Sequence, residues 1–190
     1  FGKTYAQVDL RHYLKKGLDH RARTVVRLLA RSNISGATIL EIGPGIGALH
    51  MELMKAGASS AVGYDASPAY VAAATELAQR MGFQERVDYH VGDFADQALT
   101  PDDADIVLLD RVVCCYPDMQ ALLSKSAHCA RRLYAITYPR PTWYTRIGRR
   151  VMNLAVAGCF MMMSTMSSPS QFPVSPRKVF TFESCWLGKT

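Results

Sequence analysis

The segment 38–49, which reads TILEIGPGIGAL, constrains this chain more than any other. An apolar run meets three glycines at alternate positions (Gly43, Gly45 and Gly47), and apolar residues then return at helical spacing. This order predicts a buried strand, a tight turn and a helix. Glycine allows the backbone to turn sharply and a ligand to come close, and the first amides of the helix face that ligand. The segment therefore predicts a cofactor-binding loop.

The glycines alone leave two kinds of cofactor open. Gly43, Gly45 and Ala48 also satisfy the dinucleotide pattern G-x-G-x-x-G/A, so an NAD-dependent dehydrogenase is one alternative. Glu41, two residues before the first glycine, favours another, because a carboxylate there opposes a pyrophosphate and attracts a cation. We therefore expect a positively charged cofactor.

The rest of the chain alternates strand and helix patterns, which predicts an α/β fold with a Rossmann-like, doubly wound and mostly parallel sheet. Residues 9–31 have helical spacing with an interruption near Gly17. The further strands are expected at residues 60–64, 86–91, 104–110 and 132–137, and the further helices at 46–56, 68–81 and 118–130.

A chain of 190 residues, 49% of them hydrophobic, fits a single domain. We expect this domain to span residues 1–163, with an N-terminal helical cap (1–31), a cofactor-binding core (36–138) and a C-terminal helix (139–163). Residues 164–190 begin with a Ser- and Pro-rich stretch and are expected to form an irregular tail with one weak strand pattern, at 178–182.

Three more acids follow strand patterns, at the sheet edge where open α/β folds bind ligands. Asp65 lies 22 residues after Gly43, close to the separation at which a carboxylate accepts both ribose hydroxyls of a nucleoside. Asp93 is expected to accept the exocyclic amine of adenine, and its neighbour Phe94 to pack on the ring. Asp110 ends ADIVLLD, the most apolar strand.

The net charge of +6 is unevenly distributed. Residues 1–31 hold eight Lys or Arg and two acids, and residues 119–190 hold ten Lys or Arg and one acid. The middle of the chain, residues 32–118, holds four Lys or Arg and thirteen acids. If both ends fold over one side of the domain, they form a positive rim above an acidic pocket. Such a rim favours an anionic small molecule or an anionic membrane surface, whereas solvated helix faces are the alternative interpretation.

The five cysteines, an odd number without metal-ligand spacing, argue against a disulfide framework or a metal site. They indicate small buried side chains in a reducing compartment, so we expect a cytoplasmic protein. The sequence shows no signal-peptide pattern, but it starts at Phe1 without a methionine, which leaves the true N-terminus open. The apolar stretch 151–163 is shorter than the roughly 20 residues that span a bilayer. It predicts core packing, with an interfacial helix or a substrate lid as alternatives.

Over residues 9–153 the chain resembles small bacterial class I S-adenosylmethionine-dependent methyltransferases, in particular the group similar to magnesium-protoporphyrin O-methyltransferase. The segments that carry the resemblance are ILEIGPGIG, GYDASPAY, VGDF, DRVVCCYPDMQALL and RRLYAITYPRPTW. The resemblance implies S-adenosylmethionine as the cofactor, bound by Glu41, Gly43, Pro44, Gly45, Gly47, Asp65, Ala66, Asp93, Phe94, Asp110 and Arg111. Such enzymes usually end with a helix and two antiparallel strands, of which residues 167–190 offer one candidate strand.

The resemblance implies in-line methyl transfer to a small-molecule acceptor, which requires alignment and exclusion of water and no nucleophilic side chain. If the acceptor must lose a proton, the candidate bases are His12, Asp110 and Tyr116. The candidate substrate residues are Tyr5, His12, Tyr13, Tyr116, Tyr138, Arg140 and Trp143.

Two further functions stay open. The basic ends of the chain favour a nucleic-acid methyltransferase. However, the Asn/Asp-Pro-Pro-Tyr loop of enzymes that methylate amino groups of bases is replaced here by Asp110-Arg111-Val112-Val113. Enzymes that methylate C5 of a base usually have their cysteine in a Pro-Cys sequence, which Cys114-Cys115 lacks. The unusual tail suits a non-catalytic S-adenosylmethionine-binding protein on the same fold. The oligomeric state and the acceptor are left open by the sequence.

Overall fold

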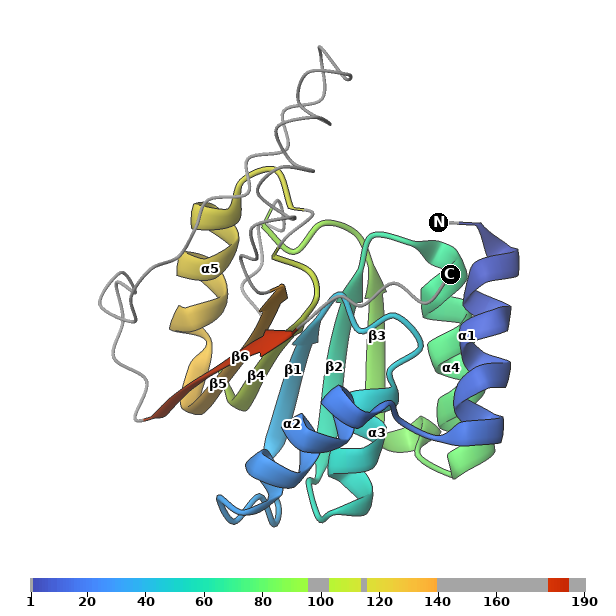
Figure 1. Ribbon diagram of the computed structural model, residues 1–190, viewed down its shortest axis with the longest axis horizontal. Helices are drawn as coiled ribbons and strands as arrows, with labels where there is room; N and C mark the ends of the chain where they lie inside the picture. Colours follow the sequence, from blue (N-terminus) through green and yellow to red (C-terminus); the bar gives the residue numbers. More distant parts are fainter. Residues whose placement is uncertain (1, 96–102, 114–115, 140–177, 185–190) are drawn as a thin grey trace.

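The computed structural model describes residues 2–95, 103–113, 116–139 and 178–184. Within these ranges the chain forms one six-stranded sheet with helices against it (Figure 1). The strands are β1 (Thr38–Ile42), β2 (Ser60–Asp65), β3 (Val87–Val91), β4 (Ala104–Asp110), β5 (Ala130–Pro139) and β6 (Lys178–Ser184). The helices are α1 (Lys3–Lys16), α2 (His20–Ala30), α3 (Ala48–Lys55), α4 (Pro68–Met81) and α5 (Met119–His128), with a short 3-10 turn, η1, at Gln84–Arg86.

The strand order is β3-β2-β1-β4-β5-β6, and every described pairing is parallel. The chain builds outward from β1 to β3, then returns to pair β4 with the other side of β1. The predicted α/β, doubly wound architecture is therefore confirmed. The reversal lies between β1 and β4, so the carboxyl ends of these strands flank the position at which such sheets bind ligands.

The front face of the sheet carries α2 and α3, and α1 and α4 lie side by side at the β3 end of the sheet (Figure 1). The predicted interruption of the N-terminal helical region lies at Gly17, whose φ of 69° ends α1. Asp19 then caps α2 by accepting a 2.7 Å hydrogen bond from the amide of Ala22. A bond of 2.7 Å from the Tyr70 hydroxyl to Asp9 ties α4 to α1.

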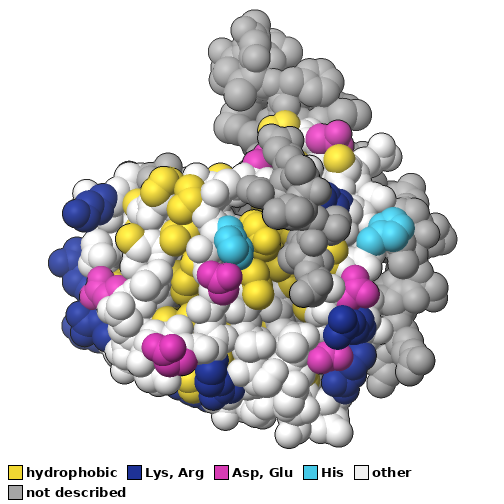
Figure 2. Space-filling view, turned by 180° about the vertical axis from the view of Figure 1, so that it is seen from behind, with side chains coloured by type: hydrophobic (Ala, Val, Ile, Leu, Met, Phe, Trp, Pro, Cys, Tyr) yellow, Lys and Arg dark blue, Asp and Glu magenta, His cyan; other side chains and the backbone are white. Residues whose placement is uncertain are grey.

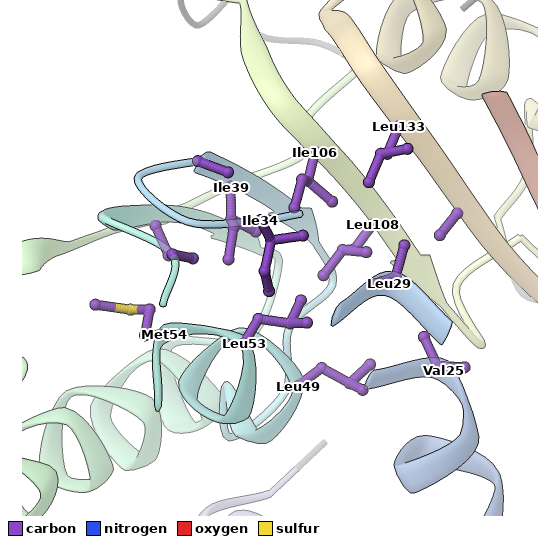
Figure 3. Packing of buried hydrophobic residues seen from close by; sticks show 14 of the residues in the cluster. Val25, Leu29, Ile34, Ile39, Leu49, Leu53, Met54, Ile106, Leu108 and Leu133 are labelled. Atoms are coloured by element: carbon purple, nitrogen blue, oxygen red, sulfur yellow. The ribbon is translucent and has the colours of Figure 1, made fainter. Parts of the chain in front are cut away.

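The front core follows from the alternation of the strands, which sends every second side chain toward α2 and α3. Leu29 of α2 and Leu53 of α3 are fully buried against Ile39, Ile106 and Leu108 of the central strands (Figure 3). These apolar contacts hold α3 flat on β1, and the loop that joins the two elements is thereby fixed at both ends.

The back face carries α5, which packs on the alternate residues of the same strands. Tyr134 of β5 is completely buried here, and its hydroxyl lies 2.7 Å from that of Ser126 in α5. Seen from behind, hydrophobic side chains gather in the middle of the molecule, with Lys and Arg toward its margins (Figure 2).

The C-terminal segment differs in part from the expectation of an irregular tail, because residues 178–184 form β6 and pair in parallel with β5. The weak strand pattern at 178–182 correctly located it, since KVFTF is rich in β-branched and aromatic residues. The outer edge of β5 is therefore covered. The predicted C-terminal helix at 139–163 lies almost wholly outside the described residues, and its first residue, Pro139, ends β5.

The described helices are short. The longest, α1 and α4, have 14 residues each, and none in the described part of the chain is long and apolar enough to cross a membrane.

We predict that Leu53→Ala destabilises the domain by about 2–5 kcal/mol, because it removes a fully buried side chain between α3 and the sheet. The free energy of unfolding from urea titration is the measurement. Leu14→Ala, at a leucine that is 47% exposed on α1, is the matched control and should change it by less than about 0.5 kcal/mol. Equal effects of the two substitutions would contradict this description of the core.

Candidate cofactor-binding site

The glycine loop joins the end of β1 to the start of α3 at the carboxyl edge of the sheet. Gly43 has a φ of 64° and donates its amide to the carbonyl of Tyr64 at 2.7 Å, which ties the loop to β2. A Cβ on Gly43 would lie 2.3 Å from Cγ2 of Val112, in the segment that follows β4. The close approach of these two segments therefore requires glycine at this position.

Asp65 ends β2 and holds the loop from the side. Its Oδ2 accepts the amide of Gly45 at 3.1 Å, and its Oδ1 accepts the amide of Ser67 at 2.8 Å. Burial raises the pKa of the Asp65 carboxyl, and the two amide hydrogen bonds oppose that shift. Each oxygen retains acceptor capacity, so the carboxylate can take hydroxyl donors of a ligand next to the glycine loop. The exposed Ala66 follows it.

Asp93 lies just beyond β3 and is contacted by the hydroxyl of Tyr116, while its Oδ1 also accepts the amide of Ala95 at 3.0 Å. The structure thus joins two residues that the sequence singled out separately.

Phe94 is placed differently from the expectation: its ring is 2% exposed and packs edge-on against Tyr64 in the back core. Because the ring is enclosed, it offers no free face to an adenine ring.

Asp110 ends β4 and is held by two neighbours. Its carboxylate pairs with the guanidinium of Arg21 from α2 and accepts a 2.5 Å hydrogen bond from the hydroxyl of Thr137 in β5. The next residue, Arg111, has a φ of 60°, which is uncommon for a residue with a side chain, and its side chain is 51% exposed. The N-terminal cap therefore reaches the carboxyl edge of the sheet through Arg21.

Glu41 has a different partner from the one expected. It is 1% exposed, and its Oε2 lies 2.5 Å from Nδ1 of His50, which is itself completely buried in α3. The other ring nitrogen of His50 lies 2.7 Å from the hydroxyl of Tyr89. Burial raises the pKa of the Glu41 carboxyl, although the contact with His50 opposes the shift. Glu41 thus lies beneath the loop rather than on its surface.

The candidate substrate residues whose side chains the structure describes lie in different surroundings. Tyr5 is 68% exposed on α1, His12 is exposed on the same helix, and Tyr13 is buried with its hydroxyl 2.5 Å from Glu52 of α3. Arg140 and Trp143 lie outside the described residues, as does the side chain of Tyr138. Of the described candidates, Tyr116 alone contacts a predicted cofactor residue.

Sequence reasoning missed several residues of the site: Arg21, His50, Tyr89, Val112 and Thr137. One signal was available for His50, a polar residue three positions after Gly47 with the apolar Leu49 and Met51 on either side. Val112 directly follows the predicted residues Asp110 and Arg111. Arg21, Tyr89 and Thr137 reach the site from another helix or across the sheet, which the sequence around them does not indicate.

Four acids lie near the carboxyl ends of adjacent strands: Asp65 and Asp110 end β2 and β4, Glu41 lies one residue before the end of β1, and Asp93 lies two residues after the end of β3. Such a set opposes the negative charge of a pyrophosphate and suits a ligand with a positive charge. In the part of the chain that the structure describes, no group of three or more side chains is arranged to hold a metal ion.

Comparisons with known proteins agree with this geometry. A family model described as a methyltransferase domain matches residues 33–186. A crystal structure of the magnesium protoporphyrin IX methyltransferase ChlM from Synechocystis PCC 6803 with bound SAH is 25% identical and has a TM-score of 0.59. The alignment covers 70% of this chain and 61% of that one. This chain therefore spans less than two thirds of the length of that relative.

Two further structures are similar. ChlM from Synechocystis PCC 6803 with bound SAM is 27% identical, with a TM-score of 0.52 and coverage of 67% of this chain and 60% of that one. The [4+2]-cyclase SpnF is 18% identical, with a TM-score of 0.52, and the alignment covers 57% of this chain and 41% of SpnF. This similarity shows the fold alone. No curated protein sequence matches the chain. The fold by itself therefore does not define the reaction.

We predict that Gly43→Ala destabilises the protein by ~1–3 kcal/mol more than Gly36→Ala in urea unfolding. Both glycines have a positive φ, but a Cβ on Gly36 meets nothing within 4 Å, whereas one on Gly43 overlaps Val112. Val112→Ala should restore part of the loss in the Gly43→Ala background. If the two single variants prove equally stable, the segment after β4 does not lie against the loop.

Proposed function

Because the chain belongs to the methyltransferase domain family, we propose that it binds S-adenosylmethionine at the glycine loop and transfers the methyl group to a small-molecule acceptor. The observation that carries the proposal is the hydrogen bond from the Gly45 amide to Asp65. It places a partly buried carboxylate beside a glycine turn at the carboxyl edge of β1 and β2, where a nucleoside can be held by its ribose.

The residues present fit this cofactor. Asp65 is placed to accept the ribose hydroxyls and Asp93 the adenine amine, with Gly43, Gly45 and Gly47 giving the ligand close access to the backbone. Arg111 is half-exposed, and its guanidinium lies 3.6 Å from the Asp110 carboxylate, so it adds positive charge to this edge of the sheet. S-adenosylmethionine supplies a methyl group already activated on a sulfonium, so the protein has to align the acceptor and keep water out.

The acceptor is proposed to be a small anion that needs no side-chain base. We assign no base among the three candidates: the Asp110 carboxylate is engaged by Arg21 and Thr137, the Tyr116 hydroxyl contacts Asp93, and His12 is exposed on α1. A carboxylate acceptor is already deprotonated at neutral pH. Arg21 and Arg111 place positive charge at the same edge, which favours an anionic acceptor.

We predict that calorimetry detects binding of S-adenosylhomocysteine, the demethylated product, to the wild-type protein, and that Asp65→Ala weakens this binding by about 1–3 kcal/mol. The loss follows from removal of the ribose acceptor and of the support for Gly45. Asp88→Ala is the matched control, because this carboxylate is 69% exposed on β3 and should leave affinity unchanged. Preferential binding of NAD would instead indicate a dehydrogenase.

Turnover is tested separately with S-adenosylmethionine carrying a labelled methyl group. Small carboxylic acids, neutral alcohols, amines, and RNA or DNA serve as acceptors, and the expected result is label transfer to a carboxylic acid. Transfer to nucleic acid would replace the proposed acceptor class. Binding of the cofactor without transfer to any acceptor would favour the non-catalytic alternative.

A further inference from the structure

A chain of polar side chains, two of them buried and the third partly buried, lies directly beneath the glycine loop. Glu41 of β1, His50 of α3 and Tyr89 of β3 are joined by contacts of 2.5 Å at Nδ1 and 2.7 Å at Nε2 of the histidine ring. The backbone amide of His50 also donates to Glu41 Oε2 at 3.3 Å. In the described part of the chain, no buried side-chain nitrogen or oxygen lacks a hydrogen-bond partner, so this chain of bonds satisfies its members.

The strand register brings these residues together. Glu41 is paired with Gly63 of β2, and Gly63 with Tyr89, so the three form one row across the sheet. Gly63 has no side chain, which leaves the middle of the row open. A Cβ there would lie 2.8 Å from Cδ1 of Tyr89 and 3.1 Å from Cγ of Pro44, so the Tyr89 ring occupies that space beside the loop proline. His50 bridges the row from the helix side.

The loop rests on the outer end of this chain. A Cβ on Gly47 would lie 2.8 Å from Nε2 of His50 and 2.9 Å from the hydroxyl of Tyr89, so the loop backbone packs directly on their hydrogen bond. Gly47 has a φ of 76°, begins the turn into α3, and donates its amide to the carbonyl of Pro44 at 2.9 Å. A shift of either ring therefore changes the position of the loop.

The protonation states follow from the surroundings. Burial and the charge of Glu41 raise the pKa of Tyr89 far above its usual range, so its hydroxyl stays protonated and donates. A neutral histidine ring has one donor and one acceptor nitrogen, so with Nδ1 donating to the Glu41 carboxylate, Nε2 accepts from the Tyr89 hydroxyl. With this assignment each hydrogen bond in the chain has one donor and one acceptor.

We propose that His50 and Tyr89 are positioning residues for the cofactor loop, and that Glu41 acts on the cofactor through them rather than by touching it. The expected effect on cofactor affinity rests on the proposed function, whereas the expected effect on the position of the loop does not. Removing the Tyr89 hydroxyl leaves the ring in place and takes away the bond against which Gly47 packs.

The test compares Tyr89→Phe with Tyr134→Phe. Both remove a hydroxyl with a 2.7 Å partner, from a partly buried ring at Tyr89 and a buried ring at Tyr134, but Tyr134 bonds Ser126 on the back face, away from the loop. Hydrogen–deuterium exchange of the ligand-free protein reports on amides 43–49, and calorimetry with S-adenosylhomocysteine reports on affinity. Tyr89→Phe should speed exchange at these amides and weaken binding about three- to tenfold.

Tyr134→Phe should lower the midpoint of urea unfolding but leave both readouts unchanged. Gly63→Ala provides a second variant, because it displaces the Tyr89 ring without removing a polar group, and it should act in the same direction as Tyr89→Phe. If the exchange at amides 43–49 is equal in Tyr89→Phe and Tyr134→Phe, the chain of bonds is ordinary core and the proposal is overturned. Absence of wild-type binding would refute the proposed function, while the exchange data would still decide the positioning role.

Discussion

The structure depends on the way in which the glycine loop is held between β1 and α3. Its amides at Gly43 and Gly45 are taken by Tyr64 and Asp65 at the end of β2, and its turn at Gly47 packs on His50 and Tyr89. These contacts come from two adjacent strands, β2 and β3, and from the helix α3. A loop restrained from this many directions is preorganised, so a ligand that binds it loses little free energy in ordering the protein.

Much of this could be predicted from the sequence, because the signals are local. The alternation of strands and helices identified the parallel α/β sheet, and the boundaries of α4 and β4 were predicted to the residue. The acids at strand ends were recognised for the same reason: once strands are parallel, Asp65, Asp93 and Asp110 must share one edge. Membership of the methyltransferase domain family agrees with the resemblance seen in the motifs.

Residues that act across the sheet could not be found in this way. His50 and Tyr89 are 39 positions apart, and only the register of β1, β2 and β3 reveals that they meet. Arg21 reaches Asp110 because α2 docks on the front core, a tertiary contact without a sequence signal. Phe94 illustrates the converse, since its place in the sequence suggested an adenine contact whereas the back core encloses its ring. Which residues contact the cofactor remains a prediction.

The central claim is that a carboxylate-flanked glycine loop at the switch between β1 and β4 receives a positively charged sulfur nucleoside. A crystal structure of the protein with S-adenosylhomocysteine tests it most directly. The account predicts ribose hydroxyls on Asp65, adenine beside Asp93 and no contact between the nucleoside and Glu41. A nucleoside bound away from the loop would contradict the claim, and one bound directly by the Glu41 carboxylate would contradict the role given to His50 and Tyr89.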